Sequence, residues 1–198
     1  MRRAYQQDLR AFLAGIIPGA EHALVFGEGP DHPVLMLIGE APGEQESLQG
    51  RPFVGKAGKN LDRFLELAGL DREEIYISNA VKIRPTKVSQ TGRVSNRPPT
   101  KEEIALFRPW LLREISEIRP KMIATLGNVP LGAVTGCKQT IGQVHGTVIP
   151  AGETGVPLFA LYHPASLIYN RSLESVYEQD VRTLAKRLGE LSDMKTDI

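Results

Sequence analysis

Four short apolar runs, separated by stretches with helical spacing, constrain the fold of this chain more than any other feature. The runs cover residues 34–38, 75–80, 122–126 and 157–161. Short runs that are apolar at nearly every position are typical of parallel strands buried on both faces. Because helical patterns alternate with them, we predict an α/β fold: a three-layer α/β/α sandwich with a central, mainly parallel four-stranded sheet.

Three stretches between and after these runs have apolar residues at helical spacing. They cover residues 57–68, the segment that follows Thr100, and residues 172–188. Thr100 and Glu103 have the spacing of a capping box, which marks the start of a helix. A further helix and a short edge strand at 23–26 are expected before the first apolar run.

The overall composition limits the classes of protein to consider. With 41% hydrophobic and 24% charged residues, the chain matches one soluble globular domain, predicted to span residues 1–198 with a mobile tail after about residue 191. The net charge is +1, so any binding of nucleic acid must depend on local clusters of basic residues. No run approaches the roughly 20 apolar residues of a membrane-spanning helix, and the N-terminus lacks the apolar core of a signal peptide.

Cys137 is the single cysteine of the chain. One cysteine excludes an intramolecular disulfide and a metal cluster held by several cysteines of one chain. This usage is typical of a protein from a reducing compartment, and we expect a cytoplasmic protein that contacts no membrane.

Polar residues stand at the carboxyl end of each predicted strand. Glu40 follows the first strand, Asn79 lies near the end of the second, Asn128 follows the third after a glycine, and His163 follows the fourth. In an open parallel sheet, ligands bind beyond the carboxyl ends of the strands. The four positions therefore predict one site along this edge of the sheet.

Glu40 and Asn79 have side chains suited to different tasks in such a site. Glu40 lies in the turn 39–43, which has neither the glycine pattern of dinucleotide binding nor a phosphate loop. A carboxylate in this turn is able to orient water, with a helix cap or a solvated carboxylate as the alternative interpretation. Asn79 either complements the edge of a nucleobase with a donor and an acceptor, or forms a turn at the strand end.

Phe53 and His163 are the other candidate site residues. Phe53 lies among glycine, proline and arginine in residues 50–55, where it either stacks on a flat ligand or plugs the loop from beneath. His163 precedes Pro164, which holds the histidine backbone extended. Its place at a strand terminus favours a functional histidine, whereas the other histidines are interpreted as structural.

A basic segment and a short apolar segment indicate contact with nucleic acid. Residues 75–101 hold six basic residues and no acidic residue, and after Arg84 they are expected to form a loop of roughly sixteen residues. Such a segment suits phosphate contacts, with a solvated loop as the alternative. Residues 165–171 either wedge between stacked bases or pack under the last helix.

Six segments, in the same order, resemble the uracil-DNA glycosylase superfamily, specifically its family-four, iron–sulfur-containing branch. They are GEAPGEQE (39–46), GRPFVGKAGKNLDRFL (50–65), YISNAVKIRP (76–85), RPPTKEEI (97–104), RPKMIATLG (119–127) and YHPAS (162–166). Together they span most of the chain from Val25 to the final helix. The resemblance implies an enzyme that flips uracil out of DNA and hydrolyses its N-glycosidic bond, leaving an abasic site.

The resemblance also implies a role for each residue of the predicted pocket. Gly39, Glu40 and Ala41 would line the uracil pocket and place the attacking water. Phe53 would stack on the base, Asn79 would pair with its Watson–Crick edge, and His163 would hydrogen-bond the O2 oxygen as negative charge develops there. Glu40 and His163 are therefore the predicted catalytic residues. The predicted DNA contacts are Pro42, Gly43, Lys56, Lys82, Arg84, Asn128, Ser166, Leu167 and Arg171.

The chain departs from the family at the four cysteines that hold its four-iron cluster. Ile83 and Phe107 occupy two of those positions, and the N-terminal pair falls near Phe12 and Gly15. We therefore predict no metal and no cofactor, and a small hydrophobic cluster that ties the N-terminal helix to the basic loop. A related branch traps its product covalently through a loop histidine; residues 86–98 contain none, which disfavours that mechanism.

The sequence thus predicts a monomeric, metal-free DNA glycosylase of base excision repair that acts on DNA containing uracil. Two alternatives remain open. One is a glycosylase for another deaminated base, hypoxanthine or xanthine, which Asn79 disfavours. The other is a non-catalytic member of the superfamily that holds DNA or a nucleobase without turnover, which the intact set of pocket residues disfavours.

Overall fold

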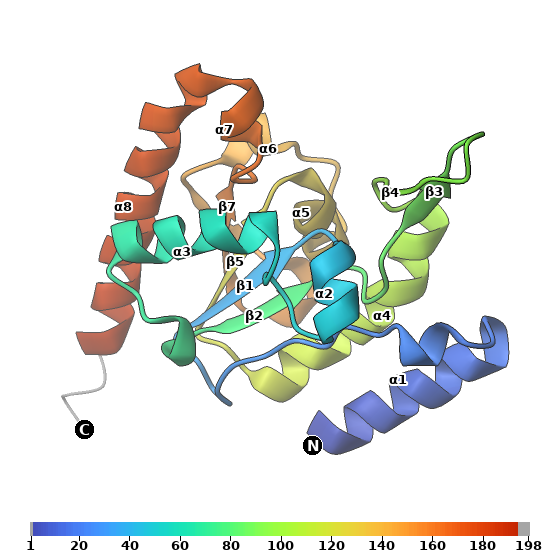
Figure 1. The fold of residues 1–198 in the computed structure, drawn as a ribbon. Coiled ribbons are helices and arrows are strands. Elements are labelled where there is room, and N and C mark those ends of the chain that lie inside the picture. The colour runs from blue at the N-terminus through green and yellow to red at the C-terminus, as the bar shows by residue number, and fades with distance from the viewer. Residues whose placement is uncertain (1, 194–198) are drawn as a thin grey trace.

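The computed structural model describes residues 2–193 and has a central five-stranded sheet between helices (Figure 1). The strand order is β2-β1-β5-β7-β6. The first four strands in this order run parallel, and β6 is antiparallel to β7. The prediction of a mainly parallel sheet is therefore confirmed. The strands of this sheet are β1 (Leu35–Gly39), β2 (Tyr76–Asn79), β5 (Met122–Leu126), β6 (Val148–Pro150) and β7 (Pro157–Leu161).

Two details of the predicted sheet are wrong. The sheet has a fifth strand, β6, which is only three residues long and too short to give a pattern in the sequence. Residues 23–26 form no strand, and the neighbouring Glu28 instead makes an isolated antiparallel bridge with Ile77. Gly27 and Gly29 flank Glu28, and Gly29 has a φ of 140°, so the backbone there does not continue as a regular edge strand.

The predicted helices at 57–68, after Thr100 and at 172–188 correspond to α3, α4 and α8. The capping box is confirmed: Thr100 Oγ1 accepts from the Glu103 N–H at 3.2 Å, and Glu103 Oε2 accepts from the Thr100 N–H at 2.7 Å. The described part of the chain contains no helix long and apolar enough to span a membrane. The helices are α1 (Arg2–Ile16), α2 (Glu44–Gln49), α3 (Lys56–Ala68), α4 (Lys101–Ile118), α5 (Asn128–Thr135), α6 (Ile141–Val144), α7 (Ser166–Tyr169) and α8 (Glu174–Asp193).

The tail predicted to be mobile after about residue 191 begins within the last helix. Helix α8 continues past residue 191 to Asp193, and residues 194–198 lie outside the described residues. Short 3₁₀ turns connect the larger elements at Ala20–His22, Arg72–Glu74, Gly152–Thr154 and Arg171–Leu173.

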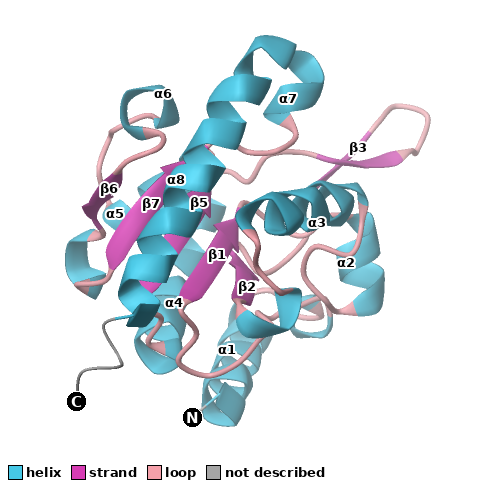
Figure 2. Ribbon diagram, turned by 90° about the vertical axis from the view of Figure 1, so that its left-hand side faces the viewer, coloured by secondary structure: helices cyan, strands magenta, loops and turns pink. Residues whose placement is uncertain are grey.

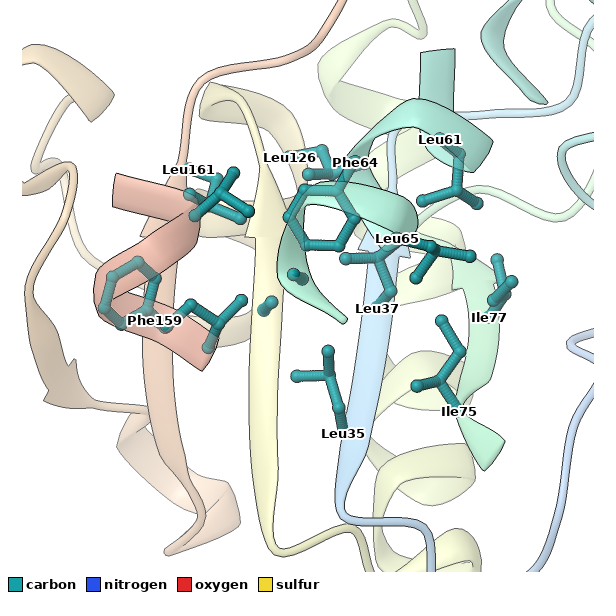
Figure 3. Close-up of a cluster of buried hydrophobic side chains, with 14 of the residues drawn as sticks. Leu35, Leu37, Leu61, Phe64, Leu65, Ile75, Ile77, Leu126, Phe159 and Leu161 are labelled. Atoms are coloured by element: carbon teal, nitrogen blue, oxygen red, sulfur yellow. The ribbon is translucent and has the colours of Figure 1, made fainter. Parts of the chain in front are cut away.

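Helices cover both faces of the sheet, which confirms the three-layer architecture. Successive side chains of β1 alternate between the faces: Leu35 and Leu37 pack with α3 and α8, whereas Met36 and Ile38 pack with α4 and α5. Figure 3 shows the first of these clusters, in which Phe64 of α3 lies over the strands. The sheet is thus buried on both faces, and its carboxyl edge is the part left for a site.

A third apolar cluster joins α1 to the start of the basic segment, as predicted, and also includes Phe107 of α4. Its buried members include Leu9 and Leu13 of α1, Val81 and Phe107, with Ile83 packed against them. Ile83 and Phe107 thus pack together at two of the positions where the resemblance places cysteines. Phe12 lies outside the cluster core, and the centroid of its ring lies 5.2 Å from the centroid of the Trp110 ring.

The basic segment is more regular than the predicted loop. It forms an antiparallel hairpin of β3 (Thr86–Val88) and β4 (Val94–Asn96). Polar residues and a lone glycine dominate its sequence, so the pattern indicated a loop, yet Thr and Val at the paired positions favour a strand. Figure 2 shows this hairpin extending away from the sheet.

Candidate active site

The carboxyl ends of four neighbouring strands meet at one edge of the sheet. Because β2, β1, β5 and β7 are parallel neighbours, Asn79, Gly39, Gly127 and His163 follow one another along this edge. Gly39 and Asn79 are paired directly in the register of β1 and β2. The sheet thus brings the ends of all four predicted strands to one site.

Phe53 and Asn79 converge on the glycine at the end of β1. A methyl group added to Gly39 would lie 2.5 Å from Asn79 Oδ1 and 2.5 Å from Phe53 Cζ. Both side chains are nearly inaccessible, with exposed fractions of 6% for Phe53 and 3% for Asn79. Since only glycine leaves room for both, Gly39 allows an aromatic ring and an amide to lie side by side.

The turn that carries Phe53 has an unusual backbone conformation. Phe53 has a φ of 53°, in the left-handed region that residues other than glycine rarely adopt. Its carbonyl oxygen packs so closely on the first turn of α3 that a methyl group at Gly58 would lie 2.1 Å from it. Surrounding structure must enforce such a conformation, and such residues cluster at functional sites.

Glu46 ties the turn of Phe53 to the turn that follows β1. Its buried carboxylate accepts hydrogen bonds from the backbone N–H groups of Gly43 at 3.1 Å, Val54 at 3.1 Å and Gly55 at 2.7 Å. Sequence reasoning missed this role. A signal was present, because Glu46 stands three residues after Gly43 at the start of α2, which is the spacing of a capping box.

Glu40 follows Gly39 and is half-buried at the edge of the sheet. Burial raises the pKa of its carboxyl group above the ordinary value. Within residues 2–193, no basic side chain forms an ion pair with this carboxylate. A partly desolvated carboxylate without a counter-ion is a stronger base than a solvated one, which suits Glu40 to orient and activate water.

His163 follows β7 and packs over Gly127 at the end of β5. A methyl group at Gly127 would lie 3.3 Å from His163 Cβ. The Nδ1 atom accepts a hydrogen bond from the backbone N–H of Ala165 at 3.1 Å, so a neutral ring carries its proton on Nε2. Burial lowers the pKa of the imidazole and favours this neutral form. His163 is therefore a neutral N–H donor.

Lys82 is not a surface residue, which corrects its predicted contact with DNA. The side chain is fully buried. Its Nζ atom donates to Glu114 Oε2 at 2.5 Å, to Ser78 Oγ at 2.6 Å and to the backbone carbonyl of Asn79 at 2.7 Å. A phosphate cannot reach this ammonium group. Lys82 instead fixes the backbone of Asn79 from below the site.

Glu114 of α4 completes the buried network around Lys82. Besides the lysine, its carboxylate accepts from Tyr76 Oη at 3.0 Å and from Ser78 Oγ at 2.9 Å. Sequence reasoning missed this residue as well. The partial signal is that Glu114 shares the buried face of α4 with Leu111, where a charge requires a partner.

Four of the other predicted DNA contacts lie at accessible positions. Lys56 and Arg171 are exposed. Arg84 is partly exposed and donates from Nε to Asn96 Oδ1 at 2.6 Å. Asn128 is exposed, and its Oδ1 already accepts from the backbone N–H of Ile141 at 2.7 Å.

The remaining predicted DNA contacts are less accessible. Pro42 is buried, so its ring is not available to DNA, while Gly43 and Ser166 are partly exposed. Leu167 is partly buried and packs against the cluster beneath α3 and α8. This packing corresponds to the alternative that was left open for the apolar segment after His163.

The residues present do not fit a cysteine-ligated iron–sulfur cluster. Ile83 and Phe107 pack in an apolar cluster, and the single cysteine, Cys137, is exposed at the surface. Among the residues the structure describes, no group of three or more His, Cys, Asp or Glu side chains could hold a metal ion.

The fold and the site define an α/β protein with an aromatic ring, an amide and an imidazole gathered at the carboxyl edge of its parallel strands, where open sheets of this class bind ligands. The sequence model of the uracil DNA glycosylase superfamily matches residues 26–185. The chain therefore belongs to the uracil DNA glycosylase superfamily.

Individual relatives agree with this assignment. The type-4 uracil-DNA glycosylase of Thermotoga maritima is 41% identical over 154 residues, or 76% of this chain and 74% of that protein. That of Saccharolobus solfataricus is 39% identical over 170 residues, or 82% of this chain and 75% of that protein. The crystal structure of Pedobacter heparinus SMUG2 matches with a TM-score of 0.57 and 14% identity, covering 82% of this chain and 77% of that one, and supports the fold alone.

Proposed function

We propose that this protein is a uracil-DNA glycosylase that hydrolyses the N-glycosidic bond of uracil flipped out of DNA and thereby begins base excision repair. The main structural support for this proposal is the convergence of Phe53 and Asn79 on Gly39. An aromatic ring beside an amide suits a flat base with a donor and an acceptor on one edge. Membership of the family and the names of the relatives support the same activity.

Asn79 and Phe53 select the base. The amide oxygen of Asn79 accepts from uracil N3–H while its NH₂ group donates to O4, and Phe53 covers one face of the ring. Cytosine has an acceptor at N3 and a donor amine at C4, so it leaves both groups of the amide mispaired. A buried amide that is mispaired in this way discriminates strongly against the wrong base.

His163 stabilises the leaving base. When the bond between the sugar C1′ and N1 breaks, its electron pair moves to the base and negative charge develops on O2. The neutral Nε2–H of His163 donates a hydrogen bond to that oxygen without giving up its proton. The base therefore leaves as a stabilised anion.

Glu40 directs the water that completes the reaction. The sugar becomes an oxocarbenium-like cation as the base departs. The water oxygen bonds to C1′ and passes a proton to the carboxylate, leaving an abasic sugar. The raised pKa of Glu40 favours acceptance of this proton.

The activity is tested with single-stranded and duplex oligonucleotides that carry uracil, hypoxanthine or xanthine, followed by alkaline cleavage of abasic sites. We expect scission at uracil, reduced about 10²–10³-fold in His163→Ala because one donor to the developing anion is lost. His22→Ala, at an exposed histidine, is the matched control and should leave the rate unchanged. Scission only at a purine base would indicate the first alternative activity, and binding without scission the non-catalytic one. No scission above His163→Ala on any substrate would contradict an enzyme.

We further propose that the protein acts as a monomer without an iron–sulfur cluster. The packing of Phe107 and Ile83 supports the absence of a cluster, because apolar side chains join α1, the strand end and α4 at that place. The measurement is the iron content and visible absorbance of protein purified without oxygen, together with its mass in solution. Stoichiometric iron or a dimer would contradict this part of the proposal.

A further inference from the structure

The hairpin of β3 and β4 has no core of its own. Its two strands pair only with each other, and residues 86–94 are all exposed. In both views the hairpin projects from the body of the protein (Figures 1 and 2). An isolated two-stranded hairpin is at best marginally stable in water. Packing among the hairpin's own side chains therefore does not explain the stability of this element.

The base of the hairpin is attached to the start of α4 and lies beside the turn that follows β1. Arg97 donates two hydrogen bonds of 2.7 Å to the carboxylate of Glu103 and one of 3.0 Å to the Thr86 carbonyl. Asn96 accepts from Arg84 at 2.6 Å, and its Nδ2 would lie 3.4 Å from a methyl group at Gly43. The hairpin thus begins beside the turn that follows β1, and its direction is fixed relative to that turn.

The outer part of the hairpin combines cations with exposed valines. Val88 and Val94 are paired across the strands and are 68% and 50% exposed. Lys87 and Arg93 each precede one of these valines, so they lie on the opposite face of the hairpin. Neither forms an ion pair within the described part of the chain. Residues 75–101 contain no acidic residue, and Glu44 and Glu103, which reach this segment from outside it, pair with Arg84 and Arg97 nearer its base. Exposed valines on one face and unpaired cations on the other suit insertion of the hairpin into the groove of a polyanion that has an apolar framework.

We infer that the hairpin is an arm that contacts duplex DNA beside the flipped nucleotide, an inference that rests on the proposed function. Lys87 and Arg93 contact phosphates, while Val88 and Val94 pack on deoxyribose carbons of the groove wall. Five extended residues from Thr86 reach about 16 Å. With one base pair per 3.4 Å of axis, that length spans about five base pairs. The arm therefore lengthens the DNA footprint from the pocket along the duplex.

The charge contribution is tested through the salt dependence of binding to a uracil-free duplex, which requires no catalysis. Each phosphate contact contributes about 0.9 to the slope of log K against log salt, so Lys87→Gln with Arg93→Gln should make the slope shallower by about 1.8. Arg182→Gln with Lys186→Gln, on the exposed side of α8, is the matched control and should leave the slope unchanged. An unchanged slope in the hairpin variant, or an equal change in the control, would overturn the inference.

The apolar contribution has a separate test. Val88→Thr with Val94→Thr keeps β-branched side chains that favour the strand and removes one methyl group from each. We expect a several-fold loss of affinity for the duplex at every salt concentration, with no change in slope. Val148→Thr, at another exposed valine, is the control. Unchanged affinity in the double variant would contradict the apolar contact.

A turnover measurement separates the arm from the pocket. A short single-stranded substrate ends before the arm, so its kcat/KM should be the same for the wild type and the hairpin variants, while kcat/KM on the long duplex falls. An equal fall on both substrates would show that the variants disturb the pocket and would overturn the arm. If the wild type excises no base at all, the proposed function fails, and the salt slopes still decide whether the arm binds DNA.

Discussion

The two halves of the candidate active site are held in opposite ways. On the side of β1 and β2, ionised groups fix the site: Lys82 holds the Asn79 backbone, and Glu46 holds the turn of Phe53. On the side of β5 and β7, burial alone lowers the pKa of His163, with no charged side chain contributing. A backbone N–H and a glycine hold this histidine.

This difference matches the tasks of the two halves. A residue that reads the base must be rigid, and hydrogen bonds to charged groups are stronger and more directional than neutral ones. A residue that donates to a developing anion must stay neutral, and a carboxylate nearby would favour its protonated form. The buried charges therefore lie where they confer rigidity and are kept away from the imidazole.

The largest effect is expected where the buried ion pair is broken. Lys82→Met leaves the Glu114 carboxylate buried without its cation, which should lower the free energy of unfolding by about 3–5 kcal/mol. Arg63→Met breaks an exposed pair with Glu174 and should cost about 1 kcal/mol or less. Chemical denaturation of both variants measures the difference. Equal losses would show that the buried pair has no special role.

A double variant separates stability from the placement of Asn79. Lys82→Met with Glu114→Gln removes the stranded charge and should recover most of the lost stability. The Asn79 carbonyl lacks the Lys82 donor in both the single and the double variant. The preference for uracil over cytosine should therefore be weaker than in the wild type in both variants. Recovery of both stability and selectivity would mean that the lysine does not position Asn79.

The next effect concerns the turn of Phe53. Glu46→Gln keeps the size of the side chain but replaces a charged acceptor of three N–H bonds by a neutral one, which should cost about 1.5–3 kcal/mol. We expect KM for the uracil-containing strand to rise more than kcat falls, because Phe53 loses its fixed position. Glu66→Gln, at an exposed glutamate of α3, is the control. A KM equal to that of the wild type would show that Phe53 does not need this support.

The position of the site at the carboxyl edge of the sheet could be predicted from the sequence, because it depends on patterns among residues close together in the chain. The apolar run of β1 and the residues after it identified Gly39 and Glu40, and the Thr100 capping box marked the start of α4. The burial of Lys82 could not be predicted in this way. Its partner Glu114 stands on a helix thirty-two positions later, and only the tertiary fold brings them together. Without that contact, a lysine in a basic segment indicates a phosphate ligand.

The smallest effect is the pH dependence that His163 adds to stability. Its pKa in the folded protein lies below the ordinary 6.5, so as the pH falls below that value the unfolded chain binds a proton that the folded protein refuses. As the pH decreases from 6.5 toward the lower pKa of the folded protein, the free energy of unfolding should therefore decrease, by at most about 1.4 kcal/mol per pH unit for one group. His163→Gln should show a flatter dependence in denaturation at several pH values, and His22→Gln should not. An unchanged pH dependence in His163→Gln would mean that the ring is not buried in its neutral form.

The reading of the base by Asn79 is tested most directly by the base preference of Asn79→Asp, measured as single-turnover excision rates for uracil and cytosine at the same position in DNA. A carboxylate accepts from the cytosine amine but cannot donate to uracil O4, so the ratio of the two rates should fall by about 10-fold or more. Asn128→Asp, which keeps an acceptor for the Ile141 N–H, should leave the ratio unchanged. A ratio for Asn79→Asp equal to that of the wild type would contradict the claim that Asn79 reads the base at this edge of the sheet.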